Sequence, residues 1–327
     1  MIPIYEVSNA ELSALRCERI AQEVGAASYT KLWLTPDGKR IIKLFSEEDT
    51  TREFFDEDIK NDTSTLIALS SVSHCFDDRF VLPKMIYQRQ SRIIGYSMPF
   101  ICGRTLSQAK PLSMVDFKRV VRQVYDDIIF VNNKFGFSIA DLHEDNIILG
   151  NDGKIYHIDL DGWRCGDGKG RRSRYIAFES ERLASCSPKY KFDGNGKIIP
   201  DVNSDLLCLV HIIFNHLLQT SFYFAEMMPE DQLRYLNYIT ECCNVADLAA
   251  VYKNLFSRED NYFDIQIIQF LPDDISTFSY DTFIQRTSRF KTQDDAMAFL
   301  QLNETHLQQI IPGRGLLTNN KYCNNAR

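Results

Sequence analysis

Residues 139–163 constrain this chain more than any other stretch. They read IADLHEDNIILGNDGKIYHIDLDGW, in which Asn-Asp-Gly lies between two β-favouring runs, a strong signal for a β-hairpin. Asn146 precedes the first predicted strand and Asp159 ends the second, so we expect both side chains at one edge of the hairpin. Carboxamide and carboxylate oxygens brought together there suit a hard cation such as Mg²⁺. Asp141, just upstream, is placed to orient a hydroxyl group or accept its proton.

This order of residues, D-x-x-x-x-N, a hairpin and then an Asp, resembles the catalytic loop and metal-binding Asp of the protein kinase superfamily. By this resemblance Asp141 corresponds to the catalytic-loop Asp, and Asn146 and Asp159 correspond to the metal-binding residues. The chain departs from the family where Ile139-Ala140 replaces His-Arg, and where Asp161 stands in place of the Gly of D-F-G. The cofactors implied are ATP with Mg²⁺ or Mn²⁺.

The resemblance implies an α+β, two-lobed protein-kinase-like fold with a small β-rich N-lobe and a helical C-lobe. Residues 1–102 are expected to form the N-lobe with an N-terminal helix, and residues 103–260 the C-lobe. Residues 261–327 lose the resemblance and are expected to form an appended helical segment with a polar, flexible tail.

The N-terminal part predicts a helix over residues 8–18, capped by Ser8 or Asn9, and then three antiparallel strands that end at Phe45. Residues 25–28 join the first two strands and correspond to the phosphate-covering loop, in which Gly25 and Ser28 are the expected nucleotide contacts. Only one of the family's usual three glycines is present there.

Lys43 corresponds to the strand lysine that holds the α- and β-phosphates of ATP in the family. Strand alternation supports this assignment, because Ile42 and Leu44 face one way and Lys43 faces the other, toward the expected cleft.

Other positions follow from the resemblance. Residues 46–72 are expected to contain a helix whose Asp62 pairs with Lys43, one methylene shorter than the family's Glu. Residues 81–87 and 92–106 predict two more strands, with Met98 behind the nucleotide pocket. Residues 99–103 correspond to the hinge that reads adenine, where Ile101 is a candidate contact.

Two further helices are predicted over residues 114–135 and 201–220. Asp205, at the start of the second helix, is expected to bond backbone groups of the catalytic loop. His211 and His216 lie in its apolar body without metal-ligand spacing, so we interpret them as core residues.

A cluster of basic residues follows Trp163 in the activation-segment region, which closes with Ala-Phe-Glu where the family has Ala-Pro-Glu. It indicates a polyanion site, for a ligand such as an activating inositol polyphosphate, formed by Lys169, Arg171, Arg172 and Arg174. Ala140 replaces the Arg that receives a loop phosphate in phosphorylation-regulated kinases, which favours an external ligand over loop phosphorylation.

The bulk composition is that of an ordinary globular protein, with 44% hydrophobic and 25% charged residues among 327. A net charge of −7 argues against a general nucleic-acid binder. Nine scattered cysteines, without metal-ligand spacing, indicate free thiols in a reducing compartment. No signal peptide or membrane-spanning run is evident, so a soluble protein is expected. A monomer is a separate expectation. Arg286, Arg289 and Lys291 give only a weak indication of contact with acidic lipid.

The expected function is an atypical protein kinase that transfers the γ-phosphoryl group of ATP to a protein hydroxyl, Ser or Thr rather than Tyr. The pattern of departures resembles effector kinases that intracellular bacterial pathogens deliver into host cells through a specialised secretion system, which would make the substrate a host protein. Three alternatives remain open. His143, in D-L-H-x-x-N, is similar to small-molecule kinases of the aminoglycoside and choline type. A pseudokinase scaffold is the second alternative, and a kinase fold that transfers AMP is the third.

Overall fold

The computed structural model describes residues 1–8, 10–11, 30–35, 37–45, 52–109, 112–166, 170, 190–194, 196–218, 234 and 236–237. It is a mixed α/β structure. One compact unit comprises residues 1–110, 127–173 and 200–205, and the remaining segments belong to a second. The predicted phosphate-covering loop, the basic cluster and the C-terminal segment from residue 261 lie outside the described residues.

Five strands form the main sheet of the first unit, in the order β1-β4-β5-β3-β2. They are β1 (Ile4–Glu6), β2 (Thr30–Leu34), β3 (Arg40–Phe45), β4 (Met85–Arg89) and β5 (Arg92–Pro99). Neighbouring strands are antiparallel except β1, which runs parallel to β4 and was not predicted. Gln90 and Ser91 join β4 to β5 with φ values of 49° and 62°. Positive φ at both positions is the geometry of a tight two-residue hairpin.

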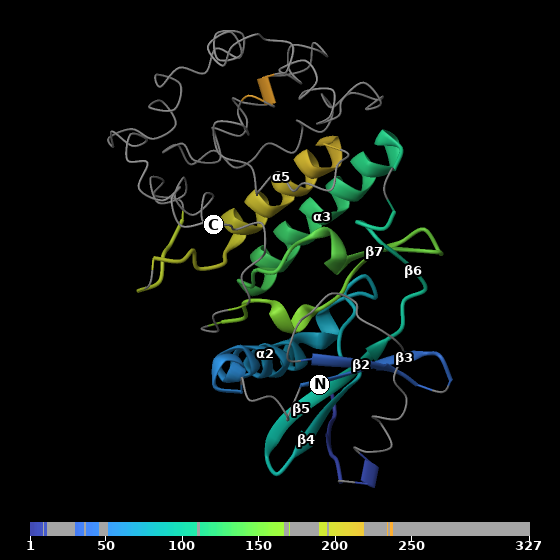
Figure 1. Cartoon of the computed structure of the whole chain (residues 1–327), viewed down its shortest axis with the longest axis vertical. Coiled ribbons are helices and arrows are strands. Elements are labelled where there is room, and N and C mark those ends of the chain that lie inside the picture. Colours follow the sequence, from blue (N-terminus) through green and yellow to red (C-terminus); the bar gives the residue numbers. More distant parts are fainter. Residues whose placement is uncertain are drawn as a thin grey trace, which may run out of the picture. The chain divides into compact units, whose positions relative to one another are not determined.

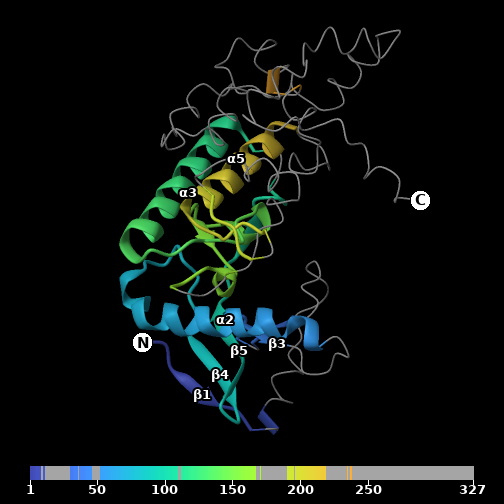
Figure 2. The same ribbon diagram turned by 90° about the vertical axis from the view of Figure 1, so that its left-hand side faces the viewer.

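The helix α2 (Arg52–Val72) lies across one face of this sheet (Figures 1 and 2). Its Ile59 and Leu66 join a buried cluster with Phe45 of β3 and Tyr96 of β5. Ile42 and Leu44 belong to a different cluster, with Trp33 and Tyr87. The predicted alternation of β3 is therefore confirmed, and Lys43 lies on the side of the sheet that α2 covers.

A smaller sheet of the same unit contains β6 (Gly103–Thr105), β7 (Ile147–Gly150) and β8 (Ile155–His157) in that order. The predicted hairpin is confirmed, because β7 and β8 are antiparallel around the turn at residues 151–153. The single strand predicted over residues 92–106 is wrong. Phe100 still donates to the Lys39 carbonyl, whereas the Cys102 carbonyl already accepts from Asn151 beside the second sheet. The chain therefore leaves the main sheet and joins the smaller sheet between Phe100 and Cys102.

Helices α3 (Met114–Phe135) and α5 (Val202–Leu218) confirm the two later helix predictions. Ser113 caps α3, because its hydroxyl accepts the Asp116 N–H at 3.1 Å and donates to the Asp116 carboxylate at 2.7 Å. In the second unit His216 stacks on Phe117 with ring centroids 3.7 Å apart, and His211 is fully buried, as expected of core residues. In the part of the chain that is described, no helix has the length and apolarity needed to cross a membrane.

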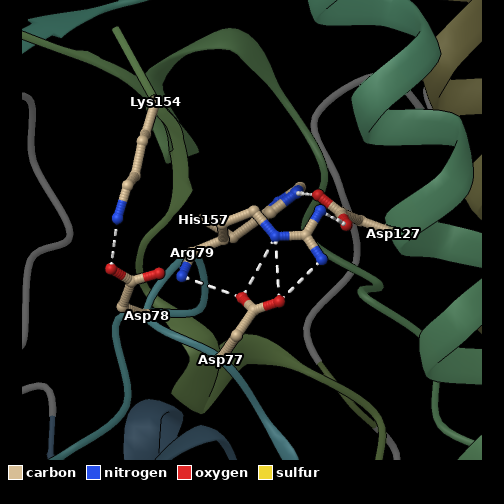
Figure 3. Close-up of polar contacts among 6 residues, drawn as sticks. All are labelled: Asp77, Asp78, Arg79, Asp127, Lys154 and His157. Atoms are coloured by element: carbon tan, nitrogen blue, oxygen red, sulfur yellow. Dashed lines mark hydrogen bonds and ion pairs between the residues drawn. The ribbon is translucent and has the colours of Figure 1, made fainter. Parts of the chain in front are cut away.

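A buried polar network holds β8 in the first unit (Figure 3). The carboxylate of Asp127 accepts from His157 Nε2 at 2.9 Å and from Arg79 Nη1 at 2.7 Å, and Arg79 also forms a fork with Asp77. These contacts hold the pKa of Asp77 below its usual value and raise that of Arg79. The ring of His157 stacks on Phe80. Because His157 also exchanges backbone hydrogen bonds with residues 79 and 81, the end of β8 is fixed from several directions.

We predict that Asp127→Asn lowers the free energy of unfolding by about 2–4 kcal/mol, since it removes a buried charge that serves two donors. The matched control is Asp78→Asn, because Asp78 pairs with Lys154 at 2.5 Å on the surface, where its side chain is 66% exposed. That change should cost less than about 1 kcal/mol. Denaturant unfolding of both variants checks the prediction, and equal losses would contradict it.

His211 predicts a dependence of stability on pH. Burial lowers the pKa of its imidazole from 6.5 to about 3. Below pH 6.5 the unfolded chain takes up a proton that the folded chain refuses, so stability is lost as the pH falls toward about 3. His211→Leu should reduce the slope of unfolding free energy against pH by about 1.4 kcal/mol per pH unit in this window. Unfolding curves at several pH values test this, with the exposed His74→Gln as the control. Unchanged slopes in His211→Leu would rule the effect out.

Candidate active site

The segment before Asp141 is held by one buried carboxylate. Asp205, near the start of α5, accepts from the Ser138 hydroxyl at 3.0 Å, the Ile139 N–H at 2.8 Å and the Ala140 N–H at 2.9 Å. Burial raises the pKa of the Asp205 carboxyl to about 7, and the three hydrogen bonds oppose that rise. The predicted bonds from Asp205 to the backbone before Asp141 are therefore present.

These bonds hold Ala140 in an unusual conformation, with φ of 59°. A non-glycine residue in the left-handed region costs about 1–2 kcal/mol, so its neighbours must enforce it. The next residue, Asp141, donates its N–H to the Ile139 carbonyl at 2.6 Å, which completes a tight bend. The Asp141 carboxylate lies 3.6 Å from His143 Nε2, and both side chains are partly exposed. Asp141 is thus held by a strained loop, with its side chain 16% exposed.

Asn146, which ends the short helix η2 (Glu144–Asn146), links this loop to the hairpin. Its Nδ2 donates to the Asp141 carbonyl at 2.9 Å, and its own carbonyl accepts the Ile158 N–H at 3.0 Å. Asp159 follows directly, with φ of 60° and ψ of 40°, a second left-handed non-glycine residue. The sequence expectation that Asn146 and Asp159 lie at one edge of the hairpin is therefore met.

The donors at this edge fit a divalent cation. Because the Asn146 amide nitrogen is engaged, its Oδ1 is the atom able to face a cation, and the Asp159 side chain is 24% exposed. Oxygen donors of this kind suit Mg²⁺ or Mn²⁺. Among the described residues, no group of three or more His, Cys, Asp and Glu side chains is placed to hold a metal ion. A cation here would therefore take further oxygen ligands from a substrate or water.

Lys43 reaches the same edge from the main sheet. Its ammonium group, 3% exposed, forms ion pairs with Asp159 and with Asp161. Gly95 of the neighbouring strand lets β5 pair closely with β3 at this lysine, since a Cβ there would lie 2.2 Å from the Lys43 carbonyl oxygen. The lysine and the acidic edge, more than 100 residues apart in sequence, are brought together by this packing.

Asp161 is the residue of this site that sequence reasoning missed. It lies in the buried turn η3 (Leu160–Gly162), and its carboxylate also accepts the Tyr96 hydroxyl at 2.9 Å. The sequence showed only an acid in place of the family's Gly. The available signal was the apolar surroundings of Asp161, because an acid within a buried turn requires a partner.

The other predicted nucleotide contacts among the described residues are Asp62, Met98 and Ile101. Asp62 is fully buried on α2, and one turn later Thr65 donates to the Trp163 carbonyl at 2.7 Å, so this part of the helix packs on η3. The pairing of Asp62 with Lys43 stays a prediction. Met98 is buried and Ile101 packs against the same cluster. The Phe100 N–H donates to the Lys39 carbonyl. Because the N–H and C=O of one peptide unit point in opposite directions, the carbonyl of Pro99 faces away from β3.

The remaining candidates, Gly25, Ser28, Lys169, Arg171, Arg172 and Arg174, lie outside the described residues. A scan against protein-family models and a search of curated proteins found no match to this chain. The interpretation of the site therefore rests on its own residues and geometry.

Asp205→Asn tests whether this carboxylate holds the loop that precedes Asp141. An amide places an NH₂ group against one of the three donors, so we expect hydrogen exchange at Ile139 and Ala140 to accelerate about tenfold or more. The control Asp152→Asn makes the same change at an exposed carboxylate that also accepts a backbone N–H. Hydrogen exchange followed by mass spectrometry measures both variants. Undiminished protection of the loop in Asp205→Asn would show that the strained backbone is held by other contacts.

Proposed function

We propose that this chain is an ATP-dependent phosphotransferase of the protein-kinase type, with a protein hydroxyl as acceptor. One observation carries the proposal: Lys43 pairs with Asp159, the preceding residue Ile158 bonds Asn146, and Asn146 bonds Asp141, so the four candidate residues lie in one linked set. A cation-binding pair, a phosphate-binding lysine and a carboxylate able to take a proton are the groups that this reaction needs. The two-lobed fold and the domain boundaries implied by the kinase resemblance belong to the same proposal.

Each residue has a distinct role in the proposed reaction. The acceptor oxygen attacks the γ-phosphorus, the bond to the β–γ bridging oxygen breaks, and ADP leaves. Asp141 orients the acceptor hydroxyl and receives its proton, and its partly exposed carboxylate is accessible for this role. Lys43 binds the α- and β-phosphates through charge-assisted hydrogen bonds. Asn146 and Asp159 would hold Mg²⁺ or Mn²⁺, which neutralises charge on the phosphates when bound.

The surrounding structure supplies the positioning that phosphoryl transfer depends on. The left-handed conformations of Ala140 and Asp159 fix where the neighbouring carboxylates point. The Pro99 carbonyl and the N–H of Ile101 are the backbone groups proposed to read adenine. No large conformational change is needed to bring Lys43 to Asp159, because the two residues are already in contact.

A specific observation favours a second candidate, a small-molecule kinase of the aminoglycoside or choline type. His143, whose place in D-L-H-x-x-N is similar to that family, lies 3.6 Å from the Asp141 carboxylate. An imidazole there can contact the acceptor or the transferred phosphoryl group without reference to a protein substrate. The two candidates share the same chemistry and differ only in the acceptor.

Intact-mass analysis after incubation with ATP and Mg²⁺ or Mn²⁺ tests the reaction. We expect phosphate to be added to the chain itself or to proteins of an added cell extract. Asp159→Ala should reduce the rate by about a thousandfold, since it removes charge stabilisation at the transferring group. Asp78→Ala is the control, because it removes an exposed carboxylate whose ion-pair partner is Lys154 and that is not among the candidate site residues.

The remaining outcomes separate the alternatives. Addition of AMP instead of phosphate would establish nucleotidyl transfer. An ATP-dependent thermal shift without protein modification, combined with ATP consumption on addition of aminoglycosides or choline, would favour the small-molecule kinase. ATP binding without any transfer would leave a scaffold. The absence of both binding and transfer, with every divalent cation and extract tried, would refute the proposed function.

A further inference from the structure

The two carboxylates that contact Lys43 differ in their surroundings. Asp159 is 24% exposed at its side chain and lies at the edge where a cation can bind. Asp161 is fully buried, and its Oδ1 and Oδ2 lie 3.1 and 3.0 Å from the Lys43 ammonium nitrogen. One partner is therefore accessible to ligands, whereas the other is enclosed by protein.

Several elements hold the Asp161 carboxylate in place. Tyr96, which lies opposite Lys43 in the neighbouring strand, donates its hydroxyl to Asp161 Oδ1 at 2.9 Å. The turn itself is closed by two backbone hydrogen bonds, from Gly162 to Asp159 and from Trp163 to Leu160. These contacts therefore fix both the orientation and the buried position of the Asp161 carboxylate.

The charges of Lys43, Asp159 and Asp161 indicate different roles for the two carboxylates. Lys43 contributes one positive charge against the two negative charges of Asp159 and Asp161, so these three groups together carry an excess of one negative charge. A divalent cation at Asp159 compensates that carboxylate separately. Lys43 and Asp161 then remain as a neutral buried pair, which avoids an uncompensated ammonium group in the protein interior.

We propose that Asp161 is the positioning residue for Lys43: its buried carboxylate keeps the ammonium group directed at the nucleotide phosphates when Asp159 turns to the cation. This inference rests on the proposed phosphotransfer function and names a residue that the kinase resemblance does not supply. In that resemblance the partner comes from the helix, here Asp62, whereas Asp161 comes from the turn that follows Asp159. The lysine would therefore stay in place without depending on a movement of α2.

A double-mutant cycle on the full-length chain tests this pairing independently of activity. Asp161→Asn in the wild-type background should lower Tm by about 5 °C or more, because it weakens the support of a buried lysine. In the Lys43→Met background the same change should leave Tm unchanged or raise it, because Asp161 has then lost its cation. A purely structural role for Asp161 would give the same loss in both backgrounds, and that result would overturn the proposal.

Two variants serve as controls in the same two backgrounds. Asp127→Asn removes a buried carboxylate that pairs with Arg79 and His157, so its effect should not depend on Lys43. Asp62→Asn measures how much the carboxylate on α2 contributes to holding Lys43. A stronger coupling to Lys43 from Asp62 than from Asp161 would overturn the proposal. If Asp161→Asn fails to fold while its combination with Lys43→Met folds, the pairing is supported. If neither folds, Tyr96→Phe replaces Asp161→Asn in the cycle, with the same criterion.

ATP affinity gives the functional readout. Titration calorimetry with ATP and Mg²⁺ should show a Kd raised about tenfold or more in Asp161→Asn, since the phosphates lose a well-directed lysine. If the stability cycle shows coupling but the wild-type chain does not bind ATP, the pairing of Lys43 with Asp161 is supported and the phosphotransfer function is refuted. Phosphotransfer by a wild-type chain that shows no coupling would overturn the role of Asp161 alone.

Discussion

The burial of the Lys43 ammonium group is the constraint on which the site depends. A charged amine that is 3% exposed is tolerated only when carboxylates and hydrogen bonds compensate it. Here the compensating groups, Asp159 and Asp161, come from the segment that follows β8. The ion pairs therefore tie the main sheet to the hairpin end. Because Tyr96 bonds the same carboxylate, β5 is part of this connection as well.

Strain at two positions accompanies this electrostatic connection. Ala140 and Asp159 both adopt left-handed backbone conformations, and each lies next to or at a carboxylate of the proposed chemistry. Such conformations persist only where the surrounding structure enforces them. For Ala140 the enforcing group is Asp205. Asp159 is held between the hairpin, whose Ile158 bonds Asn146, and its own ion pair with Lys43.

The network of Arg79, Asp127 and His157 holds the strand that leads to the site (Figure 3). It fixes β8 two residues before Asp159, which limits how far the acidic edge can move relative to α3 within the first unit. Rigidity of this kind suits a reaction that depends on positioning and on charge compensation more than on flexible side chains.

The sequence alone determined the local elements. The turn at residues 151–153 determined the hairpin, alternation determined which face of β3 carries Lys43, and apolar periodicity determined α3 and α5. These features depend on residues close in the chain, so a sequence pattern contains the information needed. The strand β1 was missed because three residues carry too little pattern, and its parallel pairing with β4 is a long-range choice.

Only the tertiary structure decided the partners of the buried charges. The sequence showed Asp161 only as an acid in place of the family's Gly, and the network around Asp127 had no sequence signature at all. Burial and ion pairing depend on which distant elements pack together, here β3 against η3 and α3 against β8. A single sequence records which side chains can carry charge, whereas the packing decides which of those charges must be compensated inside the protein.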